Sequence, residues 1–265
     1  MWHAAESDIS SNARLKCYPV CNILQVANAP IFRESGWESE KRFYHVPAKG
    51  YAKNKERSME VSRARARAAV RDIALCNPFT HFFTWTLDAK LIDRYDDEAV
   101  KKKLENTLRN LVSRKGFLYV CIPERHKDGA LHFHGLCIPG TVRLIRAVSP
   151  RGNPLSTNRG QPIYNMADWP WGFSHCIPLD NDYERAVNYL LKYIAKGGEK
   201  IFGKWYLSAR SLRKKPDICL LERMDYDSFL STNPDAATVR LYRDICMGIK
   251  RLDKSGTPLA EGVYA

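Results

Sequence analysis

The stretch Leu131-His132-Phe133-His134-Gly135 places two histidines on either side of one apolar residue. In a β-strand, alternate side chains point to the same face. We therefore expect His132 and His134 to project together, while Phe133 turns into the core behind them. Two imidazoles on one rigid strand can bind a divalent metal ion, although paired histidines also occur in ordinary half-buried strands. Other features of the sequence distinguish a metal site from an ordinary half-buried strand.

The composition of the 265-residue chain indicates a folded protein with a polyanionic partner. Hydrophobic residues make up 45% of the chain and aromatic residues 11%, which is enough for a packed core. The formal net charge is +13, so nucleic acid is the first candidate partner and an anionic membrane surface the second. No apolar run approaches the roughly 18 residues of a membrane span, and the first residues lack a signal-peptide core. We therefore expect a cytoplasmic location, with nucleic acid as the partner and no membrane.

The hydrophobic periodicity predicts an α+β fold, with a central antiparallel sheet and helices on one face. The expected strands are residues 81–88, 117–124, 131–138 and 173–178, and the expected helices are residues 56–75, 97–114 and 181–196. Residues 139–172 are expected to form a long exposed loop, and residues 204–212 and 217–222 look extended. The expected domains are an irregular N-terminal arm (1–50), a main domain that includes a basic helix (51–222), and a C-terminal extension whose structure the pattern does not indicate (223–265).

The segment Lys127-Asp128-Gly129 predicts a hairpin turn between two of these strands. A three-residue loop with its glycine in the left-handed conformation is a common hairpin connection. Such a loop places Glu124 opposite His132, so that Glu124, His132 and His134 share one face. A two-residue Asp-Gly turn is the alternative, and it would shift the register by one residue.

Two imidazoles and a carboxylate with open positions suit Mg²⁺ or Mn²⁺, which in turn suits phosphoryl chemistry. Structural zinc is less suitable, because it needs four closed ligands. From its position alone, Glu124 is equally well explained as a surface carboxylate. In that case His126 and Asp88 are the substitutes for the third ligand.

The helix expected at residues 181–196 carries Tyr189 and Tyr193 one turn apart and outside its broad apolar face. A tyrosine that packs in the core should lie within the apolar stripe, which these two do not. A phenol can attack a phosphodiester and become covalently attached to it. Lys192 and Lys196 each follow a tyrosine by three residues, where they can hold the phosphate and assist the attack. The alternative is a pair of exposed tyrosines beside solvated lysines.

Basic residues gather in two places and predict phosphate contacts. Residues 49–71 hold eight Lys or Arg against two Glu. A charged run is usually a solvated face, but a one-signed excess favours phosphate binding. The candidate DNA contacts are Arg63, Arg65, Arg67, Arg71, Arg213, Lys214 and Lys215. Trp85 is a candidate for base stacking, although its strand could equally turn it into the core.

Three motifs in order resemble those of the HUH endonucleases: FFTWTLD (82–88), LHFHG (131–135) and VNYLLKYIAK (187–196). Among these enzymes, the chain is most similar to rolling-circle replication initiators of bacterial plasmids and small single-stranded DNA phages. WPWGFSH (169–175) and KWYLSARSLRKKP (204–216) are also similar to that family. The resemblance covers roughly residues 55–220.

The resemblance implies a ferredoxin-like or RRM-like sheet and a metal-dependent attack by tyrosine on single-stranded DNA. It implies His132 and His134 as metal ligands, Glu124 as the acidic third ligand, and Tyr189 and Tyr193 as nucleophiles. The expected reaction is a site-specific nick at an origin hairpin, followed by strand joining. A 5′-phosphotyrosine is the intermediate, and a host helicase and polymerase in the bacterial cytoplasm are the partners. The alternatives are a relaxase or transposase of the same fold, or a non-catalytic RRM-like regulator.

Overall fold

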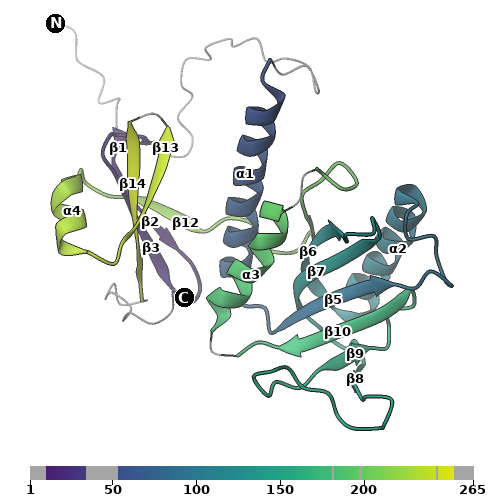
Figure 1. Ribbon diagram of the computed structural model, residues 1–265. Helices are drawn as coiled ribbons and strands as arrows, with labels where there is room; N and C mark the ends of the chain where they lie inside the picture. Colours follow the sequence, from purple (N-terminus) through teal and green to yellow (C-terminus); the bar gives the residue numbers. More distant parts are fainter. Residues whose placement is uncertain (1–9, 34–52, 181, 197–198, 243, 254–265) are drawn as a thin grey trace, which may run out of the picture. The chain divides into compact units, whose positions relative to one another are not determined.

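The chain folds into two units (Figure 1). The computed structural model describes residues 10–33, 53–180, 182–196, 199–242 and 244–253. The central unit comprises residues 54–214, and the terminal unit comprises residues 1–53 and 215–264. No helix in the described part of the chain is long and apolar enough to cross a membrane.

A seven-stranded sheet forms the middle of the central unit, in the order β11-β6-β7-β5-β10-β9-β8. All pairings between its neighbouring strands are antiparallel, which confirms the predicted α+β class. The strands are β5 (His81–Leu87), β6 (Leu118–Arg125), β7 (Leu131–Ile138), β8 (Leu144–Arg146), β9 (Tyr164–Met166), β10 (Gly172–Pro178) and β11 (Leu207–Ser208).

The three helices of the central unit begin and end close to the predicted positions: α1 (Lys55–Cys76), α2 (Asp97–Lys115) and α3 (Tyr183–Lys196). Asn54 caps the start of α1, where its side chain accepts a hydrogen bond from the backbone of Arg57. Asn77, which precedes a proline, ends α1. Gly116 ends α2 in the left-handed conformation that glycine adopts without strain.

The two faces of the sheet follow from alternation along β5. Phe83, Trp85 and Leu87 are buried on one face, and the residues between them are half-buried on the other, where the two histidines of β7 also lie. We call this second surface the histidine face. Helix α3 contacts β6 and β7 on it, and α1 packs against α3. Arg125 follows Glu124 on β6 and so points to the opposite face of the sheet. There its guanidinium binds Asp97, the first residue of α2, at 2.7 Å. The helices are therefore divided between two faces instead of gathered on one.

The segment 139–172, expected as a long exposed loop, contributes two strands to the sheet. β8 and β9 pair with each other, and β9 joins the sheet through β10. Trp169 near the end of this segment is only 5% exposed. Short strands of three residues leave no periodic signal in the sequence, which is why the pattern missed them.

The terminal unit contains a five-stranded sheet in the order β12-β2-β3-β14-β13. Its elements are β1 (Ser10–Ser11), β2 (Ala13–Cys17), β3 (Asn22–Ala27), β4 (Phe32–Arg33), β12 (Asp217–Leu220), α4 (Tyr226–Thr232), β13 (Ala237–Tyr242) and β14 (Ile245–Leu252). The expected irregular arm is thus wrong for residues 10–33. Residues 217–220, expected in the main domain, pair with β2 instead.

The reason for this difference is that β3 pairs with β14, a strand from the opposite end of the chain. Such a pairing is stabilised by contacts that no local pattern records. Phe229 of α4 is buried with Ala13 and Val26 against one face of this sheet. Among the described residues, the buried clusters of this unit combine side chains from both ends of the chain.

Gly135, next to the second histidine, has no room for a side chain. A Cβ atom there would overlap the ring of Phe83 and lie only 2.5 Å from the carbonyl oxygen of Val120. Gly135→Ala should therefore lower the free energy of unfolding by about 1–3 kcal/mol, measured by urea titration. Lys127→Ala in the exposed turn is the control and should leave the midpoint unchanged. An unchanged midpoint for Gly135→Ala would show that this close approach is not a real constraint.

Candidate functional site

The two histidines lie on one face of β7, as predicted. His134 is only 8% exposed and His132 is half-buried, while Phe133 between them is wholly buried on the other face. Thr84 and Thr86 of β5 pair with these histidines in register. Their hydroxyl oxygens lie 3.2 Å and 3.3 Å from the two Nδ1 atoms. Each imidazole is therefore held through Nδ1, which leaves Nε2 for other partners.

The hairpin turn has the predicted three-residue form. Gly129 has φ 87°, and the backbone N–H of His126 donates to the carbonyl of Ala130 at 2.8 Å. This turn sets Glu124 opposite His132, which confirms the predicted register. The carboxylate of Glu124 reaches diagonally to the next histidine, where its Oε2 lies 3.0 Å from Nε2 of His134.

The predicted set of three metal ligands is only partly assembled. His132 stacks on His126, with 4.7 Å between ring centroids, and does not join the Glu124–His134 pair. Asp88, the other substitute ligand, accepts the backbone N–H of Lys90 in the turn after β5. Within the described ranges, no three His, Cys, Asp or Glu side chains converge closely enough to hold a metal ion.

The chemistry of the donors nevertheless fits a divalent cation. Two imidazoles and one carboxylate share a face, and a threonine hydroxyl orients each imidazole from behind. Such second hydrogen bonds are typical of metal-binding histidines. The bond between Glu124 and His134 occupies one atom of each side chain, so it has to open before both could bind an ion.

Burial and neighbouring positive charge keep His134 neutral. Burial is the largest cause, and together with His132, His126 and Lys196 it lowers the pKa of His134 to about 4. Burial likewise raises the pKa of Glu124, against the opposing charges of Lys196 and His126. A neutral imidazole is the form that binds metals. A neutral His134 with its proton on Nε2 donates to Glu124, and the tautomer with its proton on Nδ1 leaves Nε2 able to bind a metal ion.

Tyr193 and Tyr189 meet at the histidine face, although only one of them is exposed. The ring of Tyr193 stacks on His134, with 3.8 Å between centroids and 9° between planes. Its hydroxyl donates a hydrogen bond of 2.8 Å to the hydroxyl of Tyr189. Tyr193 is only 9% exposed and Tyr189 48% exposed, so the expectation that both lie away from the packed face holds only for Tyr189. Burial, followed by the bond to Tyr189, raises the pKa of Tyr193.

Only one of the two predicted lysines lies at the site. Lys196 lies close enough to Glu124 and His134 to influence both pKa values, and its Nζ is 5.9 Å from the ring centroid of Tyr193. Lys192 is exposed on α3 and does not line the pocket that borders the site.

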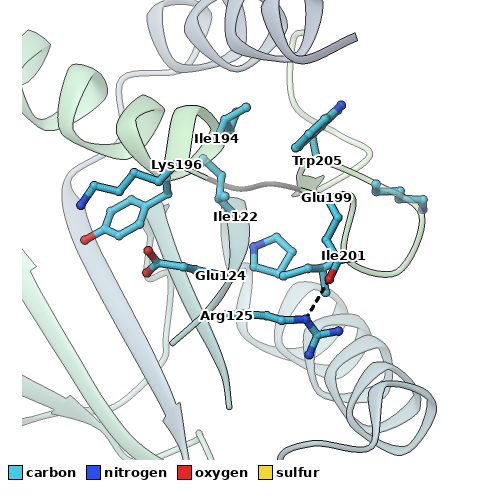
Figure 2. Close-up of a pocket in the computed structure, with 11 residues that line it drawn as sticks. Ile122, Glu124, Arg125, Ile194, Lys196, Glu199, Ile201 and Trp205 are labelled. Carbon is cyan, nitrogen blue, oxygen red and sulfur yellow. Dashed lines mark hydrogen bonds and ion pairs between the residues drawn. The ribbon is translucent and has the colours of Figure 1, made fainter. Parts of the chain in front are cut away.

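Figure 2 shows this pocket, of about 470 Å³, between β6, the end of α3 and the segment that follows α3. Glu124 and Lys196 lie at one end and Trp205 at the other. Arg125 closes the lower side, where its Nε donates to Glu199 at 3.0 Å. Ile122, Ile194 and Ile201 supply apolar walls. The pocket opens directly beside the candidate catalytic groups.

The four arginines predicted on α1 divide into two pairs. Arg65 and Arg67 are exposed. Arg63 lies over the ring of Trp205, 5.6 Å from its centroid, and Arg71 donates to Asn188 of α3 at 2.7 Å. The first pair is available for phosphate contacts. Arg63 packs α1 against Trp205, and Arg71 joins α1 to α3.

The second basic cluster is exposed at the end of the central unit. Arg213 and Lys214 are both exposed, and the backbone N–H of Arg213 donates to Asn77 at the end of α1. Lys215 is also exposed and is the first residue of the returning terminal unit.

The predicted stacking role of Trp85 is wrong. The side chain is wholly buried, stacks on Trp169 with 4.3 Å between centroids, and donates its indole N–H to the sulfur of Met166. Its strand turns odd-numbered residues into the core, so no base can reach it.

Three supporting residues were not predicted from the sequence. Thr84 and Thr86 orient the histidines, and their alternation within FFTWTLD could have indicated it once β5 was paired with β7. Arg125 bonds to both Asp97 and Glu199, which joins the start of α2 to the segment after α3. No local signal could have indicated those partners.

A comparison with known protein families gives a match over the middle of the chain. Residues 80–198 match the model of a family described as replication-associated protein ORF2. The match includes β5, the histidine strand and the tyrosine helix. No curated protein and no solved structure gives a significant match. The family match confirms the resemblance to replication initiators of phages and plasmids over residues 80–198, which are similar to this family of replication-associated proteins.

Proposed function

We propose that this protein nicks and rejoins single-stranded DNA through a tyrosine, and so starts rolling-circle replication at an origin hairpin. The observation that supports it best is the stack of Tyr193 on His134, which joins a tyrosine pair to a His–Glu pair. Two hydroxyl nucleophiles beside a potential cation site suit phosphodiester transfer. The overall charge of +13 supports a polyanionic substrate.

The residues that would hold a divalent cation, Mg²⁺ or Mn²⁺, are His132, His134 and Glu124. When bound, such a cation withdraws electron density from the scissile phosphate. Lys196 adds a fixed positive charge beside these groups and stabilises the charge that develops in the transition state.

The exposed Tyr189 is the nucleophile for the first cut. Its oxygen accepts the hydrogen bond from Tyr193, and this bond stabilises the negative charge of the attacking phenolate. Tyr189 loses its proton to solvent, its oxygen forms a bond to phosphorus, and the bond from phosphorus to the 3′-oxygen breaks. The 3′-oxygen takes up a proton and leaves as a free hydroxyl, which a host polymerase can extend while a host helicase unwinds the duplex.

Joining is the reverse attack of a 3′-hydroxyl on the 5′-phosphotyrosine, so the reaction needs no ATP. Tyr193 then serves the next cut, once the first tyrosine holds a strand end. A relaxase or transposase would use the same chemistry on a different DNA. A non-catalytic RRM-like regulator would bind DNA without cutting it, and the adduct assays below separate it from an enzyme.

The metal ligands are tested by removing one donor at a time. His132→Ala and His134→Ala should each abolish nicking of single-stranded fragments tiled across the DNA that carries the gene. Glu124→Ala should raise the Mn²⁺ concentration needed for half-maximal nicking. EDTA should stop the wild type and added Mn²⁺ should restore it, with circular dichroism as the control for folding. Full activity in EDTA would contradict the metal requirement.

The tyrosine pair is tested by removing the hydroxyls. Tyr189→Phe should lose most first-cut product because Tyr193 is buried, and Tyr193→Phe should lose less. The double variant should form no covalent adduct on a denaturing gel. Mass spectrometry of the trapped wild-type adduct should find DNA on both residues. Adduct formation by the double variant would place the nucleophile elsewhere on the chain.

The division of the α1 arginines predicts two different phenotypes. Arg65→Gln and Arg67→Gln should each flatten the log–log salt dependence of DNA binding by roughly one unit or slightly less. Arg71→Gln should instead lower the melting temperature, because it loses the bond to Asn188. An unchanged slope for both variants would show that these arginines form an ordinary solvated surface and do not contact phosphates.

A further inference from the structure

The histidine face continues beyond the candidate catalytic residues onto the outer strands. One cross-strand row runs through four strands and consists of Glu124, His132, Thr86 and Phe173. Residues directly opposite each other in a sheet project to the same face. Neighbouring strands lie about 4.8 Å apart, so Phe173 is two strands, or about 10 Å, from His132.

Phe173 is exposed where aromatic side chains are usually buried. Its relative exposure of 69% is the highest among the large hydrophobic residues that the structure describes as exposed. The adjacent Ser174 and Cys176 face the core. The phenyl ring therefore lies on the surface because of the register of β10, and not because the strand is frayed.

The backbone that carries this ring is fixed by its neighbour. Gly172 has φ 144°, in the region that favours glycine, and a Cβ atom there would overlap the carbonyl oxygen of Thr86. Only a glycine lets β10 approach β5 this closely. The close approach sets the position of Phe173 relative to the histidine row.

The surface around the ring is open and mixed in character. His175, two residues along β10 on the same face, is exposed, as are Asn165 of β9 and its pairing partner Ile145 of β8. By contrast, α3 covers the β6 and β7 part of this face. The histidine face thus has a covered half with the tyrosines and an open half around Phe173.

We infer that Phe173 is a stacking platform for an unpaired base of the DNA strand, next to the scissile phosphate. This inference rests on the proposed function, which brings single-stranded DNA onto the histidine face. Nucleotides on one side of a phosphate held at His132 then lie over the open half. An exposed ring can stack on any base without reading its sequence, at about 1–3 kcal/mol per base. The net charge of +13 favours DNA over an apolar protein segment as the occupant.

Binding is measured without chemistry, in EDTA and in the Tyr189→Phe/Tyr193→Phe background. The probe is a fluorescein-labelled oligothymidylate of about 30 nucleotides, long enough to cover one domain. Phe173→Ala should weaken binding by roughly 5- to 150-fold, and Phe173→Trp should restore it. The salt slope should stay unchanged, because no charge is removed. Ile218→Ala, which truncates a side chain that is 50% exposed in the terminal unit, is the control and should bind normally.

Photocrosslinking gives a second, direct readout. The same oligonucleotide with 5-iododeoxyuridine should crosslink to the peptide that contains Phe173. Unchanged binding of Phe173→Ala together with no crosslink there would overturn the inference, whether or not the protein nicks DNA. A change in the solution mass of the free Phe173→Ala protein, with DNA binding unchanged, would also overturn it and make this face a protein contact. If Phe173→Ala weakens DNA binding but the protein with both tyrosines forms no covalent adduct, the stacking inference is supported and the nicking proposal is contradicted.

Discussion

The candidate site depends on the register of the β6–β7 hairpin. Side chains alternate between the two faces of a strand, so a slip of one residue would turn Glu124 away from the histidines. The turn prevents this slip, because Gly129 adopts φ 87° and Asp128 accepts the backbone N–H of Ala130 at 3.0 Å. A separate pairing aligns β7 with β5 and brings the threonine hydroxyls to both imidazoles. The turn therefore determines the position of Glu124, and the β5–β7 register determines the threonine contacts on the histidine face.

The second feature of the site is its gradient of burial. His134 and Tyr193 are stacked and nearly buried, whereas Tyr189 and His132 are reached from solvent. Burial lowers the pKa of His134 and raises that of Tyr193, so both side chains are neutral at physiological pH. A neutral buried pair can pack tightly without an uncompensated charge. The exposed Tyr189 and the half-buried His132 are the members of these pairs that solvent reaches.

The surroundings of the site differ on its two sides. Toward the end of α3 lies a walled pocket in which Arg125 ties Glu199 to the start of α2. Toward β10 lies an open surface with a protruding phenyl ring. A polymer that passes the tyrosines would meet both environments in turn. Enclosed pockets favour one group in one orientation, and open aromatic surfaces tolerate any base.

The sequence by itself determined the features that depend on neighbours along the chain. The alternation of LHFHG placed the two histidines on one face, the Asp-Gly turn placed Glu124 opposite His132, and the 3.6-residue period placed the two tyrosines one turn apart. Tertiary structure decided everything that depends on partners far along the chain. It buried Trp85 and Tyr193, left Tyr189 and Phe173 exposed, and assembled β3 with β14 into a second sheet. The physical reason is that periodicity says which residues share a face, but only packing says whether another element covers that face.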